Sequence, residues 1–131
     1  MLGTIKNVRM TRIKACSTNF SNKKRLENDC PEVFAANVIG GQWALAICCY
    51  LINGSLRYTE IRKCLPNITE RMLTLQLRKL EEHRVVKRHV YAEVPARVMY
   101  ELTKLGYPLR PIIEELGKWG EKLKQAPEFN K

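Results

Sequence analysis

Apolar side chains recur at helical spacing through the middle of the chain, with short polar or glycine-rich breaks between them. Residues Val33–Ile52 form a run of 20 residues without a charged side chain, a length that can span a bilayer. The pair Gly40-Gly41 interrupts this run. We therefore expect two short helices, over residues 31–39 and 42–52, and no membrane span.

Both of these helices have a predicted inward face. In the first helix, Phe34, Val38 and Ala35 are expected to point inward. In the second helix the apolar residues at helical spacing are Trp43, Ile47, Tyr50 and Leu51.

A second pair of helices is predicted over residues 58–64 and 70–83, joined by a turn at Pro66-Asn67. Thr69 is a suitable N-cap for the later helix. At the helical period the buried stripe is Leu73, Leu77 and Leu80. The opposite face carries Arg71, Thr74, Leu75, Arg78 and Glu82. Such a face directly after a short turn is typical of a helix-turn-helix. Periodicity alone leaves open an ordinary solvated helix face.

Two strands are predicted next, over residues 85–91 and 98–102, joined by a short turn that contains Pro95. The hairpin carries a cluster of basic side chains, Lys87, Arg88, His89 and Arg97. Two helices followed by a basic hairpin are the order of a winged helix-turn-helix, whose wing contacts phosphates or a groove. We therefore expect an α+β fold, mostly α, with a two-stranded wing.

The last predicted helix is capped by Thr103 and broken or kinked near Pro108 and Pro111. Its apolar stripe is wide enough to require a partner surface, either the first helix of the same chain or a second copy. The stripe consists of Leu105, Leu109, Ile112, Ile113, Leu116, Trp119 and Leu123.

Charge narrows the choice of partner. The 131 residues include 23 Lys or Arg and 13 Asp or Glu, a net charge of +10. Residues 1–29 carry seven basic and two acidic side chains, a net charge of +5. Residues 57–97 carry ten basic and five acidic ones, again a net +5. An excess concentrated in two segments suggests a polyanionic partner, which could be a nucleic acid such as double-stranded DNA, an acidic membrane surface or an acidic protein.

The cysteines favour neither a metal site nor a disulfide framework. The five cysteines contain no C-x-x-C pair, and both histidines lie elsewhere. The N-terminus lacks the apolar core of a signal peptide, so we expect a cytoplasmic protein with reduced thiols. Cys48 and Cys49 are expected in the core, whereas Cys30 and Cys64 flank polar residues and are candidates for exposed thiols.

The chain shows no pattern of a catalytic site. It has no glycine-rich phosphate loop, no Ser/His/Asp arrangement and no paired carboxylates in an apolar setting. We therefore expect no enzyme, no catalytic residues, no cofactor and no metal.

Seven short blocks between Cys30 and Gly120 resemble, in order and near the same spacing, the HxlR-type transcriptional regulators, which are bacterial relatives of MarR-like winged-helix proteins. The blocks are Cys30-Pro31, Ile39–Trp43, Arg57–Ile61, Ile68–Thr74, Leu77–Glu81, Glu93–Tyr100 and Leu102–Gly106. The resemblance implies a homodimer joined by its terminal helices, with helix 69–83 in the major groove and the wing 85–102 at the minor groove or backbone. Two half-sites about one helical turn apart would form a pseudo-palindromic operator.

The resemblance also implies the side chains that face DNA. On the recognition helix they are Thr69, Arg71, Thr74 and Arg78. On the wing Arg97 is implied, and the hairpin cations Lys87 and Arg88 join it. Arg57 either touches the backbone or pairs with Glu60. The implied dimer interface is Ile112, Ile113, Leu116, Trp119 and Leu123.

The chain departs from the family pattern at two places. Leu75 replaces a residue that is often polar, so base preference does not transfer. His83-Arg84 replaces a turn that often contains glycine, so the recognition helix is expected to run further.

Some members of the family sense oxidants through a cysteine near the start of the first helix, where Cys30 stands. One hypothesis is a disulfide between Cys30 and Cys64 of the other subunit; the alternative is that both are incidental thiols. A small-molecule effector is also open.

These predictions divide the chain into a basic N-terminal arm (1–29), a winged helix-turn-helix domain (30–102) and a C-terminal dimerisation helix with its tail (103–131). A protein-interaction module without sequence-specific DNA binding is the alternative function.

Overall fold

A computed structural model describes residues 19–127, with side chains described from residue 24 onward. The chain divides into two compact units between Gly40 and Gly41. The first 18 residues of the predicted arm, including Cys16, lie outside the described residues.

The described part of the first unit consists of two helices, α2 (Asn19–Asp29) and α3 (Pro31–Val38). Cys30 is the extended N-cap of α3, and Pro31 occupies its first turn, where a missing N–H costs nothing. The side-chain amide of Asn37 donates to the carboxylate of Glu27 at 2.7 Å and so ties α3 to α2. The prediction that Phe34 points inward is wrong, because its side chain is 47% exposed.

The predicted break at the glycine pair is confirmed. Gly41 has a φ of +81°, which favours glycine. A Cβ on Gly40 would lie 2.8 Å from the carbonyl oxygen of Ala36, closer than side chains tolerate. No single helix within residues 19–127 is long and apolar enough to cross a membrane. Helices α3 and α4 (Gly41–Leu51) are long and apolar enough only when taken together, with a bend between them.

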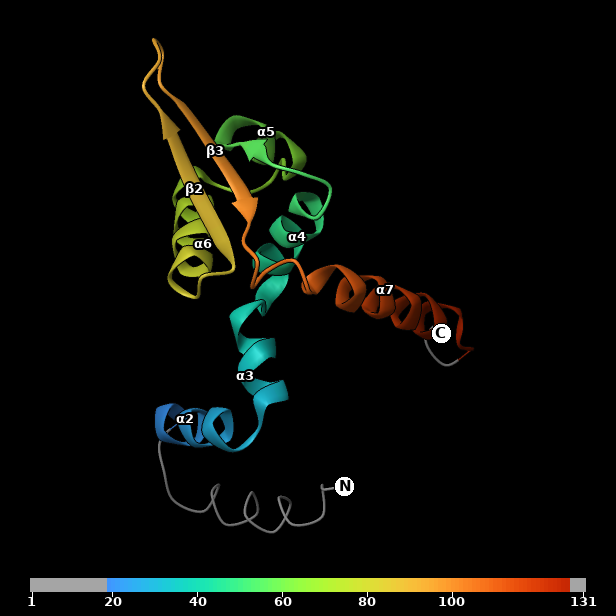
Figure 1. The fold of residues 1–131 in the computed structure, drawn as a ribbon. Coiled ribbons are helices and arrows are strands. Elements are labelled where there is room, and N and C mark those ends of the chain that lie inside the picture. The colour runs from blue at the N-terminus through green and yellow to red at the C-terminus, as the bar shows by residue number, and fades with distance from the viewer. Residues whose placement is uncertain (1–18, 128–131) are drawn as a thin grey trace. The chain divides into compact units, whose positions relative to one another are not determined.

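The described part of the second unit, residues 41–127, combines four helices with a small antiparallel sheet (Figure 1). After α4 come β1 (Leu56–Arg57), α5 (Tyr58–Cys64), α6 (Glu70–Glu82), β2 (Val86–Tyr91), β3 (Arg97–Leu102) and α7 (Leu109–Gln125). The strand order is β1-β3-β2. The expected α+β, mostly α class is confirmed. The predicted hairpin is present, but the sheet has a third strand, because Leu56 and Arg57 pair with Tyr100 and Met99.

The core of this unit lies where α4, α6 and the sheet meet, since α6 packs against both α4 and β2. The leucines predicted to line α6 inward are fully buried. On α4 the buried stripe is Ala44, Ile47, Cys48 and Leu51. The predicted inward face is confirmed at Ile47 and Leu51 and differs from this stripe at the two aromatic residues. Tyr50 is 42% exposed and Trp43 is only half-buried, because the spacing i, i+3, i+4, i+7 starts from the small Ala44.

Helix α6 does not run on as expected. It ends at Glu82, and Arg84 adopts a left-handed φ of +62°. A left-handed residue ends the helix here as glycine commonly does, and because Arg84 carries a Cβ this turn costs more than a glycine turn would.

Thr103 does not cap the last helix, which is a correction to the prediction. Its hydroxyl donates to the carbonyl oxygen of Arg84 at 2.5 Å and accepts from the N–H of Gly106 at 3.1 Å. A turn follows, and α7 begins only at Leu109. The chain breaks at Pro108 as predicted, whereas Pro111 lies inside the first turn of α7, where its N–H would have no partner.

In the part of the chain that the structure describes, no residue of α7 is buried. Its predicted stripe is largely exposed, with Ile112 at 53% and Trp119 at 59%.

We predict that Arg84→Gly raises the free energy of unfolding by about 0.5–1 kcal/mol. A left-handed residue with a Cβ costs about 1–2 kcal/mol, and the greater entropy of unfolded glycine offsets part of this gain. Urea denaturation measures the change. Arg84→Ala is the matched control, since it removes the same side chain but keeps the Cβ. A glycine variant no more stable than the alanine variant would contradict the prediction.

Candidate nucleic-acid interface

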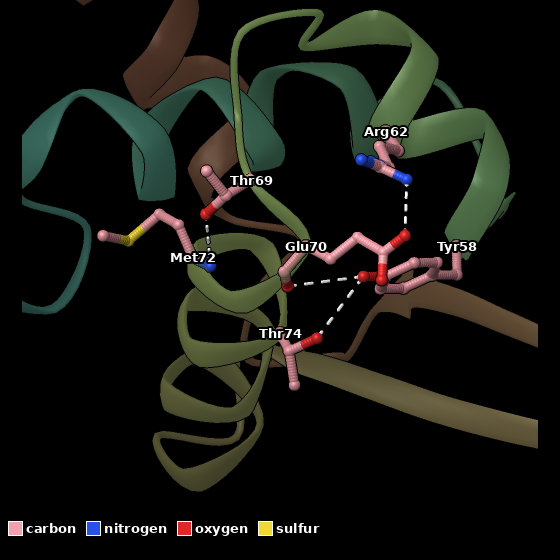
Figure 2. Close-up of polar contacts among 6 residues, drawn as sticks. All are labelled: Tyr58, Arg62, Thr69, Glu70, Met72 and Thr74. Carbon is pink, nitrogen blue, oxygen red and sulfur yellow. Dashed lines mark hydrogen bonds and ion pairs between the residues drawn. The ribbon is translucent and has the colours of Figure 1, made fainter.

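The start of α6 is fixed by a side-chain cap. The hydroxyl of Thr69 accepts a hydrogen bond from the N–H of Met72 at 3.0 Å, as predicted (Figure 2). This bond satisfies one of the free N–H groups of the first turn. Together with the buried leucines, it determines which side of α6 faces outward.

The outward side of α6 carries the residues predicted for it. Arg71, Leu75 and Arg78 are exposed, and Thr74 is half-buried. A shallow hollow of about 430 Å³ runs along this side, lined by Glu70, Arg71, Thr74, Leu75 and Arg78. Leu75 is 55% exposed, so an apolar contact is available between the two guanidinium groups.

Contacts between α5 and α6 set the angle of the helix pair, and the sequence analysis did not identify them. The Tyr58 hydroxyl lies 3.4 Å from both the carbonyl oxygen of Glu70 and Oγ1 of Thr74 (Figure 2). Nη1 of Arg62 lies 2.6 Å from Oε2 of Glu70. Arg62 is in the last turn of α5 and Glu70 in the first turn of α6, where the helix dipoles favour these charges. A basic residue at the end of one helix and an acidic residue at the start of the next could have predicted this ion pair from the sequence.

A groove of about 680 Å³ lies between α5, α6 and the hairpin. Five of the predicted DNA-facing residues line it: Arg57, Thr74, Arg78, Arg88 and Arg97. The remaining lining residues are Tyr58, Thr59, Glu81, Pro95, Ala96, Val98 and Tyr100. The structure therefore brings together cations from β1, α6 and both strands of the hairpin.

Three predicted residues lie outside the groove. Arg71 lines the adjoining hollow, and Thr69 stands at the N-cap. Lys87 lies opposite Glu101 in the register of β2 and β3. Its neighbour Arg88 lies opposite Tyr100. Because side chains alternate along a strand, Lys87 points to the face opposite Arg88.

The arginines differ in whether they have an ion-pair partner. Across residues 19–127, Arg57, Arg71, Arg78 and Arg88 have no ion-pair partner within 4 Å. Arg57 and Glu60 are joined through the backbone, because the Glu60 carboxylate accepts the Arg57 N–H at 2.7 Å, and the contact of the Arg57 side chain with DNA stays a prediction. Arg97 is different, since its guanidinium pairs with Glu93 at 2.8 Å.

Tyr100 forms part of the groove wall beside Arg88. Burial raises the pKa of the Tyr100 hydroxyl, and the neighbouring positive charge of Arg88 partly opposes this. The phenol is therefore neutral near pH 7 and can act as a hydrogen-bond donor.

The candidate redox thiols lie in different units. Cys30 is half-buried and its thiol donates to the carboxylate of Glu32 at 3.2 Å. Cys64 is half-buried at the end of α5. Their pairing across a dimer stays a prediction.

The other described cysteines are poorly suited to thiolate chemistry. Burial raises the pKa of Cys48 to about 12, with a smaller contribution from Cys49. Burial also raises the pKa of Cys49, although that residue is only half-buried and not in the core as expected. No group of three or more potential metal ligands occurs among the side chains that the structure describes.

Comparisons with known proteins agree with this geometry. A family model described as HxlR-like helix-turn-helix matches residues 38–128. The HTH-type transcriptional regulator YybR of Bacillus subtilis (strain 168) is 44% identical over 104 residues, which cover 77% of this chain and 83% of that protein.

Solved structures give the same result. The redox regulator HypR in its oxidised form superimposes with a TM-score of 0.68 at 44% identity, covering 74% of this chain and 100% of that one. A MarR-family transcriptional regulator from Porphyromonas gingivalis W83 has a TM-score of 0.66 at 37% identity, and the match covers 70% of this chain and 90% of that one. The expected winged-helix architecture is thereby confirmed.

Proposed function

The chain belongs to the HxlR-like helix-turn-helix family of transcriptional regulators, and from this premise we propose that it binds a pseudo-palindromic DNA operator as a homodimer in the cytoplasm. In this proposal α6 enters the major groove and the β2–β3 wing lies on the minor groove or backbone. The family consists of regulators rather than enzymes.

The outward side of α6 is the observation that carries the proposal. Two exposed arginines, Arg71 and Arg78, flank Leu75 there, and neither has an ion-pair partner among residues 19–127. An arginine can bond guanine with two hydrogen bonds, and an apolar side chain can contact a thymine methyl group. Arg57 and Arg88 beside the groove suit phosphate contacts that set the register.

A homodimer is proposed because the apolar face of α7 stays largely uncovered by the described residues, although the start of the helix contacts α4. Its stripe residues Ile112, Leu116, Trp119 and Leu123 are each at least 38% exposed. A helix with one wide apolar face is stable mainly when that face is covered. A second copy offers the same face, as a two-fold interface requires.

A thiol response is the second part of the proposal. HypR, which is similar over three quarters of this chain, is described as a redox regulator. In this chain the accessible candidates are Cys30 and Cys64, whereas Cys48 is fully buried.

Replacing Arg71 or Arg78 with Ala should weaken binding to DNA from upstream of the protein's own gene by about 1–3 kcal/mol, roughly 5- to 150-fold, where the arginine contacts a base. Fluorescence anisotropy under reducing conditions measures this, with scrambled DNA beside it across a salt series. Lys104→Ala, which removes an exposed charge outside the groove, is the control.

The same titration tests the function. Wild-type binding that favours the upstream duplex by about a thousandfold supports a specific regulator. Equal and steeply salt-dependent binding to both duplexes would contradict it and favour a protein-interaction module.

Wild-type protein should sediment as a dimer, at about twice the chain mass of 15.2 kDa. Trp119→Gln should raise the dimer dissociation constant by about 30-fold or more, because it removes a large aromatic contact. Lys118→Gln changes the neighbouring exposed residue and should leave the constant unchanged. A wild-type monomer at micromolar concentration would refute the dimer.

Diamide should produce a cross-linked dimer on non-reducing electrophoresis, and Cys30→Ser or Cys64→Ser should each abolish it. Cys48→Ser is the control, since that thiol is buried and its high pKa disfavours the reactive thiolate. An unshifted wild-type monomer would rule out the disulfide.

A further inference from the structure

The tip of the wing holds a charged pair that the proposed function does not use. Glu93 lies in the turn between β2 and β3, and Arg97 is the first residue of β3. Nη2 of Arg97 lies 2.8 Å from Oε2 of Glu93, and Nε lies 3.2 Å and 3.3 Å from the two carboxylate oxygens. The carboxylate therefore covers one whole edge of the guanidinium group.

An aromatic ring holds the same guanidinium group from another side. The Cζ atom of Arg97 lies 4.1 Å from the centre of the Tyr91 ring. That ring lies 6.4 Å from the ring of His89, whose Nε2 is 2.6 Å from Oε2 of Glu101. The Arg97 guanidinium group is thus held by Tyr91 at the end of β2 and by Glu93 in the turn.

Glu93 is charged at neutral pH. The hydrogen bond from Arg97 lowers the pKa of the Glu93 carboxyl below its usual value, and the charge of Arg57 adds to the effect. The negative charge of Glu93 therefore cancels the positive charge of Arg97 at the tip.

This neutral tip contrasts with the rest of the interface. Arg71, Arg78 and Arg88 have no ion-pair partner in the described part of the chain. The tip projects beyond the helices of this unit (Figure 1), and its other residues include the fully exposed Val94. A free cation at such a position would bind phosphates of any sequence, since the backbone charge is the same everywhere.

We infer that Glu93 screens Arg97 from DNA phosphates and thereby limits the sequence-independent affinity of the wing. A phosphate that approaches the free edge of the Arg97 guanidinium group also meets the negative charge of the Glu93 carboxylate bound at the other edge, which repels it. The Glu93 side chain is exposed and the Arg97 side chain is half-buried. An ion pair at the surface adds little to stability, so its effect comes from this repulsion and not from the stability of the hairpin. The inference rests on the proposed DNA binding.

The test compares wild type, Glu93→Gln, Arg97→Gln and the double variant on a random-sequence duplex, using anisotropy across a salt series. Glu93→Gln keeps the shape and removes the charge. One further phosphate contact steepens the slope of log affinity against log salt concentration by about 0.9. Between 1 M and 0.1 M salt this amounts to about eightfold, so the variant should bind about eightfold more tightly than wild type at 0.1 M salt. The double variant should return to the wild-type affinity.

Glu101→Gln is the matched control, since it removes one negative charge from the same hairpin away from Arg97. It should change affinity much less than Glu93→Gln.

Each other outcome overturns the inference. An unchanged Glu93→Gln variant shows no screening, and an equal gain in Glu101→Gln shows only a general charge effect. Weaker binding in both Glu93→Gln and Arg97→Gln shows that Glu93 positions Arg97 for contact. Wild-type protein that binds neither the random nor the upstream duplex contradicts the proposed function itself, and the inference with it.

Discussion

The burial of one leucine stripe determines the orientation of α6, and the interface depends on that orientation. Leu73, Leu77 and Leu80 are fully buried between α4 and β2. Because the helical period is constant, burying this stripe places Arg71 and Arg78 on the opposite side. A rotation of α6 that exposed the arginines differently would also expose a leucine, at a cost of about 1.5–3 kcal/mol for each side chain.

The cations around this helix divide into two kinds. Arg71 and Arg78 of α6, and Arg57 and Arg88 of the groove wall, are exposed without an ion-pair partner among residues 19–127. Arg97, which lines the groove from the wing, is matched by the Glu93 carboxylate. Net charge alone does not show this difference. A count of +10 predicts attraction to a polyanion, but the pairing of individual charges decides which part of the surface provides it.

Sequence periodicity predicted most of the second unit, because its elements have strong patterns. The leucine stripe, the Thr69 cap and the hairpin all follow from local rules. The wrong predictions concern which residues are buried, because large apolar side chains were expected inward. Phe34 and Tyr50 are large and apolar yet exposed, whereas the small Ala44 is buried.

Local sequence rules do not predict the side-chain contacts between one helix or strand and another. The bond from Tyr58 to Thr74 and the pair Arg62–Glu70 join helices whose relative angle no periodicity reveals. Arg97 was predicted correctly as a wing residue, but its pairing with Glu93 depends on side-chain geometry. The DNA contacts of the candidate residues stay predictions.

The Thr103 hydroxyl has a mechanical consequence. By bonding the carbonyl of Arg84 and the N–H of Gly106, it joins the exit of α6 to the turn that leads into α7. Arg110 adds a bond from its guanidinium to the carbonyl of Ile52, at the end of α4. Helix α7 is therefore braced at its base against the ends of α6 and α4, so a rotation of its exposed length would move the end of α6 instead of bending a loose linker.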